Sequence, residues 1–136
     1  MEREIVCLDT SILIDYFRKK SKDETTFYKL TEVPYSFAVT SITVFEIYRG
    51  VTQIQKSFWD DLFNQMDILP FDERASKIAA SLLQKLNLKN NQIALPDLFI
   101  AAIAIQKQIK LATLNRKHFE KVVELELLPV SPNERA

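Results

Sequence analysis

Short apolar runs alternate along this chain with longer segments whose apolar residues recur at helical spacing. The short runs predict buried strands at residues 4–8, 35–40, 67–71, 110–114 and 125–130. The longer segments predict helices at residues 12–20, 22–33, 41–51, 56–65, 72–88, 96–108 and 116–122. The alternation favours an α/β fold in which a central, mainly parallel sheet is flanked by helices.

The composition narrows the possible classes of protein. The chain has 136 residues and 47% apolar residues, so we expect one domain over residues 1–131 and a loose tail over residues 132–136. Its 18 Lys and Arg residues balance 18 Asp and Glu residues, so any basic surface must be local. Gly50 is the only glycine, which excludes glycine-rich phosphate-binding loops.

The sequence also bears on where the protein works. Its N-terminus lacks the basic and apolar regions of a signal peptide, and no apolar stretch reaches the roughly 18 residues that a membrane span needs. The single cysteine, Cys7, excludes an internal disulfide and lies in an apolar run, where a buried inert thiol is expected. We therefore expect a cytoplasmic protein without a membrane partner.

Two acids stand where predicted strands and helices meet, at the sheet edge where α/β proteins bind ligands. Asp9 directly follows the first strand, as a helix N-cap or as a ligand-binding residue, and the two roles can coexist. Asp97 precedes a helix that is apolar on every side and therefore buried. A buried charge needs a partner, a metal ion or backbone N–H groups to satisfy it.

Glu46 gives a weaker signal. A helical wheel over residues 41–51 places Val44, Ile47 and Tyr48 on one side and Glu46 roughly opposite, near Arg49. This pattern predicts a solvated residue with a salt-bridge partner on the same helix.

Four stretches, taken in order, resemble the PIN domain family in its VapC-like toxin branch. They are "CLDTSILIDYF", "SITVFEIYRGV", "PDLFIAAIA" and "LATLNRKHF". The resemblance covers nearly the whole chain and implies a PIN-like three-layer sandwich. It also implies a Mg²⁺- or Mn²⁺-dependent endoribonuclease, the toxin of a type II toxin–antitoxin module. Such a protein cleaves RNA, forms a homodimer and is held inactive by a VapB-like antitoxin.

By this resemblance, Asp9, Glu46 and Asp97 are metal ligands. Clustered carboxylates repel one another, and a divalent cation that prefers oxygen ligands removes that repulsion. The cation can polarise a phosphodiester oxygen and lower the pKa of bound water, so no histidine is required.

The fourth stretch departs from the family pattern. Thr113, Asn115 and Phe119 match it, but His118 stands where relatives carry an acid. The resemblance implies that Asn115 supports the water shell of the metal, whereas the missing acid leaves open whether a second metal binds. Glu120 is a possible substitute. His118 is expected at the surface, with proton donation as the alternative.

Four further residues are candidates for substrate binding: Thr10, Ser11, Arg49 and Arg116. The two hydroxyls can orient Asp9 or a phosphate, or simply begin a helix. Each arginine can contact RNA or form a salt bridge. The densest basic run comprises Arg18, Lys19, Lys20 and Lys22, as a solvated face or as an RNA-backbone contact.

Large apolar side chains are concentrated in the first two predicted helices, close to the basic run. They are Tyr16, Phe17, Phe27, Tyr28 and Leu30. We expect them to form a groove for an antitoxin helix. Trp59 and Phe63 share one helix face and belong either to the core or to a partner interface.

Two other functions compete with the nuclease. A PIN-like module that binds RNA or protein without cleaving is favoured by the missing fourth acid and disfavoured by the three that remain. A receiver-like phosphoacceptor domain would need paired acids after the first strand, and "EIVCLDT" contains one.

Overall fold

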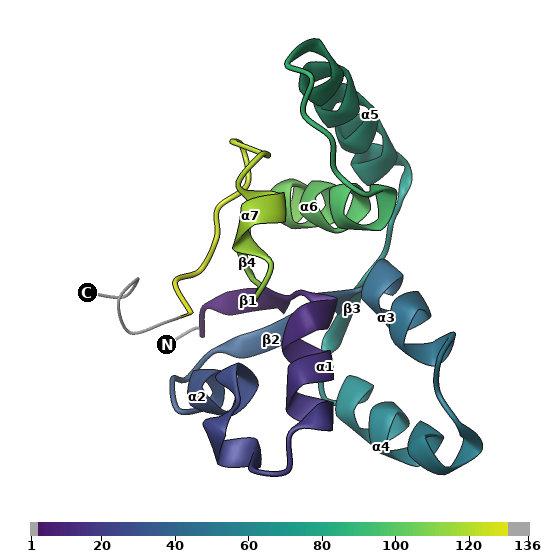
Figure 1. Ribbon diagram of the computed structural model, residues 1–136, viewed down its shortest axis with the longest axis vertical. Coiled ribbons are helices and arrows are strands. Elements are labelled where there is room, and N and C mark those ends of the chain that lie inside the picture. The colour runs from purple at the N-terminus through teal and green to yellow at the C-terminus, as the bar shows by residue number, and fades with distance from the viewer. Residues whose placement is uncertain (1–2, 131–136) are drawn as a thin grey trace.

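The computed structural model describes residues 3–130 as three layers with a parallel sheet in the middle (Figure 1). The strands are β1 (Ile5–Leu8), β2 (Ser36–Thr40), β3 (Asp67–Leu69) and β4 (Lys110–Ala112), in the order β3-β2-β1-β4. Every pairing is parallel, and Cys7 of β1 lies between Ala38 and Leu111. The predicted α/β fold is therefore confirmed. The predicted tail at residues 132–136 lies outside the described residues.

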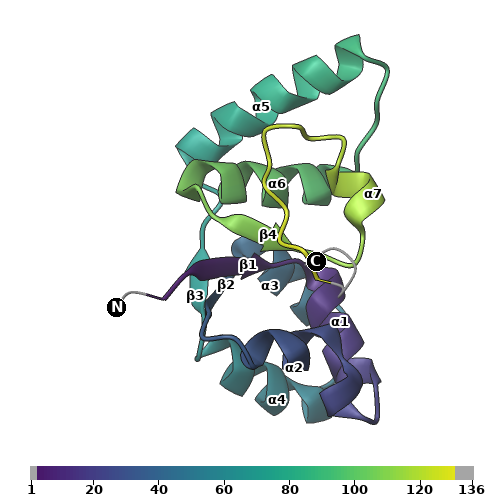
Figure 2. The same ribbon diagram turned by 90° about the vertical axis from the view of Figure 1, so that its left-hand side faces the viewer.

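Helices cover both faces of the sheet. They are α1 (Thr10–Arg18), α2 (Thr26–Thr31), α3 (Ser41–Tyr48), α4 (Gln53–Phe63), α5 (Glu73–Leu88), α6 (Leu95–Lys107) and α7 (Arg116–Phe119), with a 3₁₀ turn at Lys22–Glu24. Helices α5, α6 and α7 form one layer, and α1, α2 and α4 form the other (Figure 2). No helix within residues 3–130 is long and apolar enough to cross a membrane.

Each layer has its own apolar core against the sheet. On one side, α6 contributes six buried residues, confirming that this helix is buried: Leu98, Ile100, Ala101, Ala102, Ile103 and Ala104. On the other side, Trp59 and Phe63 of α4 pack with α1 and α2, so these two residues belong to the core. Cys7 is fully buried, and burial raises the pKa of its thiol to about 12.

Two predictions on this fold are wrong. Residues 125–130 form no fifth strand, because only Leu127 makes an isolated bridge, to Leu111. Pro129 has no N–H to continue the pairing.

The expected antitoxin groove is the second error. Phe27 and Leu30 are buried, and the rings of Tyr16 and Phe17 pack against other aromatic rings of the same domain. Only Tyr28 of that set is exposed. These side chains belong to the core because α2 and α4 lie against α1 from both sides.

The start of α1 is tied to the sheet. The backbone N–H of Asp9 donates to the carbonyl of Ala112 at 2.9 Å, which extends the pairing of β1 and β4 by one residue. Asp9 is therefore held rigidly at the carboxyl end of β1, and Thr113 follows the adjacent end of β4.

Candidate active site

A cavity of about 600 Å³ opens at the carboxyl ends of the strands. Its lining combines acids, hydroxyls and two basic residues: Asp9, Thr10, Ser11, Ile14, Asp15, Arg18, Lys19, Glu46, Asp97, Leu114 and Asn115. The three predicted metal ligands, Asn115 and both predicted hydroxyls are thus brought together. A second cavity, of about 700 Å³, lies near the amino ends of β1 and β2 and contains none of these residues. The chemistry therefore points to the smaller cavity.

Asp9 is 2% exposed, and its carboxylate is oriented by two hydroxyl groups. Ser11 Oγ and Thr113 Oγ1 each donate to Asp9 Oδ2 at 2.7 Å. Asp9 occupies the N-cap position of α1, but its side chain makes no capping hydrogen bond. The carboxylate is thus held for the cavity rather than used to begin the helix.

Glu46 is held from across the cavity. Thr10 Oγ1 lies 2.8 Å from Glu46 Oε1, with geometry for donation, and 2.9 Å from Thr43 Oγ1. The interpretation of Glu46 as a solvated residue with a partner on its own helix is therefore wrong. The helical wheel missed the contact because Thr10 is 36 positions away in the sequence. Thr10 orients Glu46, and Ser11 orients Asp9.

Asp97 lies in the first turn of α6, with its side chain 20% exposed. Burial raises the pKa of its carboxyl group, and the negative charges of Asp9 and Glu46 raise it further. A hydrogen bond from His118 and the charge of that residue act in the opposite direction. Asp97 therefore senses both other acids, although they belong to separate elements.

His118 lies beside the Asp97 carboxylate on its solvent-exposed side. Its Nδ1 lies 3.5 Å from Asp97 Oδ2, and its side chain is 60% exposed. The expected surface position of His118 is correct, but the ion-pair geometry with Asp97 was not predicted from the sequence.

The three acids are of the right chemical type to bind a divalent cation, but they lie too far apart to bind one together. Carboxylate oxygens are the ligands that Mg²⁺ and Mn²⁺ prefer. Within residues 3–130, however, no three Asp, Glu, His or Cys side chains lie close enough together to hold one ion. Asp9 Oδ1 and Glu46 Oε2 accept no hydrogen bond from the described residues. Each side chain therefore has an oxygen without a donor among these residues, and a cation shared by the three acids would require them to lie closer together.

The remaining candidates differ in position. Asn115 is exposed at the cavity wall, and its backbone N–H donates to Thr113 Oγ1 at 2.9 Å. Arg49 and Arg116 do not line the cavity. The guanidinium of Arg49 lies 5.8 Å from the ring centre of Phe45. Arg116 lies near Glu120 and donates to the carbonyl of Leu128.

The roles of two residues at the site were missed by sequence reasoning. Thr113 is a fully buried hydroxyl that holds Asp9, although the sequence singled it out only as part of a motif. Asp15, which the sequence did not single out, lines the cavity, and its Oδ2 is buried without a hydrogen-bond partner within residues 3–130. Its spacing of four residues from Ser11 was the available signal, because such residues share a helix face.

Comparison with known proteins identifies one family. The sequence model of the PIN domain family matches residues 6–125. Ribonuclease VapC1 of Methanocaldococcus jannaschii is 31% identical over 127 residues, covering 93% of this chain and 87% of that protein. Ribonuclease VapC3 of the same organism is 35% identical over 96 residues, which cover 71% of this chain and 94% of that protein.

Solved structures share the fold. A chain in the crystal structure of VapBC2 from Rickettsia felis, bound to a DNA fragment of its promoter, has a TM-score of 0.78 at 24% identity and covers 91% of this chain and 97% of its own. A chain in a toxin–antitoxin complex from Klebsiella pneumoniae has a TM-score of 0.71 at 24% identity, covering 88% and 94%.

Proposed function

This chain belongs to the PIN domain family, in its VapC-like branch, and from that premise we propose that it is a Mg²⁺- or Mn²⁺-dependent endoribonuclease. One observation carries the proposal: Asp9, Glu46 and Asp97, from three separate elements, line one cavity at the strand ends. The names of the curated relatives support ribonuclease activity.

The roles of the residues follow from their contacts. Asp9, Glu46 and Asp97 would hold the cation, which supplies Lewis-acid activation of a phosphodiester and of water. Ser11 and Thr113 orient the Asp9 carboxylate, and Thr10 orients that of Glu46. The Asn115 side chain is positioned at the cavity wall, where its amide can bind water or a phosphate oxygen.

The biological role in this proposal is that of a toxin. Related folds occur in toxin–antitoxin complexes, which supports a VapB-like antitoxin as the partner of this chain. The homodimer belongs to the same proposal and rests on the family resemblance alone. Expression of the chain alone should arrest growth, and co-expression of the neighbouring reading frame should restore it. Harmless high-level expression of the wild-type chain would contradict the toxin role.

The nuclease is tested with purified protein and a labelled single-stranded RNA. The wild-type chain should cut the RNA in Mg²⁺ or Mn²⁺ and leave it intact in excess chelator. The matched control is Asp72→Asn, which removes an acid outside the cavity and should cut at the wild-type rate. Cutting that persists in chelator would refute metal dependence.

A second function, RNA or protein binding without cleavage, is favoured by one observation. The acids within residues 3–130 do not converge closely enough for an ion as they stand. Calorimetric titration with Mn²⁺ separates the two functions. The nuclease should release or absorb heat on binding Mn²⁺, and this heat should disappear in Asp97→Asn, whereas a binding module requires no such heat.

A further inference from the structure

One face of α1 extends the cavity away from the three acids. Ser11, Ile14, Asp15 and Arg18 line it at spacings of three, four and seven residues, which places them along one side of the helix. At a rise of 1.5 Å per residue, the backbone of Arg18 lies about 10 Å along the helix from that of Ser11. The cavity thus has an acidic end at the strands and a basic end at the last turn of α1.

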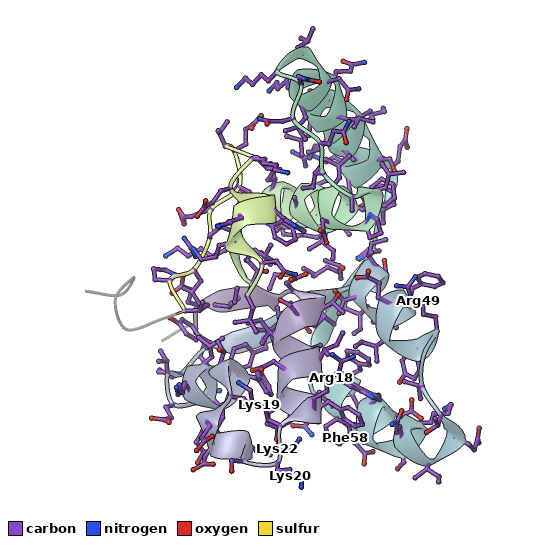
Figure 3. All side chains as sticks on the ribbon, in the orientation of Figure 1. Arg18, Lys19, Lys20, Lys22, Arg49 and Phe58 are labelled. Atoms are coloured by element: carbon purple, nitrogen blue, oxygen red, sulfur yellow. The ribbon has the colours of Figure 1, made fainter. Side chains whose placement is uncertain are left out.

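The basic run in which Arg18 lies consists of residues with different tasks. Lys22 Nζ donates to the carbonyls of Tyr16 and Phe17 and lies over both rings. It therefore caps the C-terminal end of α1. Lys20 is exposed and does not line the cavity. Figure 3 shows Lys20 beyond the end of α1, whereas Arg18 lies at the last turn of the helix.

Lys19 also lines the cavity, but its charge is paired in a salt bridge. Its Nζ lies 3.0 Å from Asp15 Oδ1, one helical turn earlier. The pair offsets the negative charge of Asp15, which would otherwise repel an anion lying along this face.

Arg18 is different, because its guanidinium makes no hydrogen bond or ion pair with any residue from 3 to 130. It is exposed and always charged, and its five donors can bind two phosphate oxygens at once. The chain has no net charge, so this free cation on the cavity wall is a local feature rather than a consequence of composition.

We propose that Arg18 binds a backbone phosphate of the RNA substrate other than the one that is cleaved, an inference that rests on the proposed function. An RNA strand cut at the acids must continue beyond them, and the face of α1 is an open path. Arg18 lies at the end of this path that is farther from the acids, about 10 Å along the helix from Ser11, so we assign it to a neighbouring phosphate. Lys19 keeps Asp15 from opposing this contact.

The test measures binding apart from cleavage. A fluorescein-labelled, mixed-sequence single-stranded RNA is titrated with the full chain in excess chelator, and the anisotropy gives Kd at several salt concentrations. For single strands, the slope of log affinity against log salt changes by about 0.7 for each phosphate contact. Arg18→Ala should reduce the slope by about 0.7. The matched control, Lys20→Ala, removes the same charge from the same run and should leave the slope unchanged.

A second variant tests the role of the ion pair. Asp15→Asn removes the negative charge beside Lys19, so it should bind the RNA more tightly than the wild-type chain at low salt. Circular dichroism and melting of each variant verify that the fold is intact.

Several results would overturn the assignment. Equal slopes for Arg18→Ala and the wild-type chain would remove Arg18 from the RNA path, and equal losses in Arg18→Ala and Lys20→Ala would reduce it to bulk charge. If Arg18→Ala weakens binding of polyglutamate but not of RNA, the residue receives an acidic protein segment instead. Binding through Arg18 without any cutting in Mn²⁺ would support the assignment and contradict the nuclease, so the two proposals fail separately.

Discussion

Asp72 and Asp97 both lie at the start of a helix, and the two helices, α5 and α6, pack against each other. Asp72 is the N-cap of α5 and accepts hydrogen bonds from the Ala75 N–H at 2.9 Å and from Gln106 Nε2 at 3.0 Å. The Ala75 N–H, followed by Gln106, lowers the pKa of the Asp72 carboxyl group. In Asp97 the direction is opposite, because burial and two neighbouring acids raise the pKa.

The difference shows that position at a helix start does not decide what an acid does. The charge of Asp72 is satisfied by donors from its own helix and from the adjacent one. The Asp97 carboxylate accepts no backbone hydrogen bond from residues 3–130, and its close partner is the exposed His118. An acid satisfied by its own fold stabilises the fold, whereas an acid set against other acids is suited to an external cation.

The largest expected effect comes from Asp97→Asn. Cleavage should fall by more than about 100-fold, beyond the 10–100-fold loss typical of residues that only support a ligand. The metal-free protein should melt at an equal or higher temperature, because one of three repelling charges is gone. RNA cleavage and melting in chelator measure the two effects. Wild-type cleavage by this variant would refute the site.

A smaller effect is expected from Thr113→Val, which removes a donor to Asp9 while keeping the shape of a fully buried side chain. Cleavage should fall by about 10-fold, with a higher Mn²⁺ concentration needed for half-maximal rate. Ser76→Ala is the control, because its hydroxyl donates to the carbonyl of Asp72, outside the cavity. Equal Mn²⁺ requirements in both variants would show that Thr113 does not position a ligand.

Asn115→Asp should change metal binding modestly. A fourth carboxylate in the cavity adds repulsion without metal and attraction with it, so the variant should melt lower in chelator and gain more on adding Mn²⁺. The melting shift between chelator and saturating Mn²⁺ is the measurement. A shift equal to that of the wild type would place residue 115 beyond the reach of the metal.

The smallest effect on cleavage is expected at Asp72. Asp72→Ala should leave the cleavage rate unchanged and lower the Tm by roughly a few degrees, because the cap of α5 is lost. The pKa of Asp72 is lowered on folding, so its stabilisation is present above its ordinary value of 3.8 and is lost as pH falls through the lower, folded-state pKa. The Tm difference between the two proteins should therefore shrink below about pH 4. A difference that persists at lower pH would assign the loss to packing.

Much of the fold could be predicted because the relevant signals are local. The apolar run before Asp9 became β1, and the all-apolar segment after Asp97 became the buried helix α6. Element ends were less predictable: α4 begins at Gln53 rather than residue 56, because Thr52 and Gln55 form a capping box. The expected strand at residues 125–130 failed because a short run with Pro129 could not continue the pairing.

The candidate site was also predictable only in part. The family resemblance singled out Asp9, Glu46 and Asp97, but the helical wheel alone assigned Glu46 to solvent. Its contact with Thr10 and the cavity position of Asp15 depend on how α1 and α3 lie beside each other, which no local pattern records.

By itself, the sequence determined the alternation of strands and helices, the burial of α6 and the position of Asp9 at the end of β1, because hydrophobic periodicity acts over a few neighbouring residues. Only the tertiary structure decided which acids share a cavity, which hydroxyls hold them and which residues of the basic run line the same cavity. Those relations join residues as far apart as Asp9 and Thr113, separated by 104 positions, and packing of the whole domain brings them together.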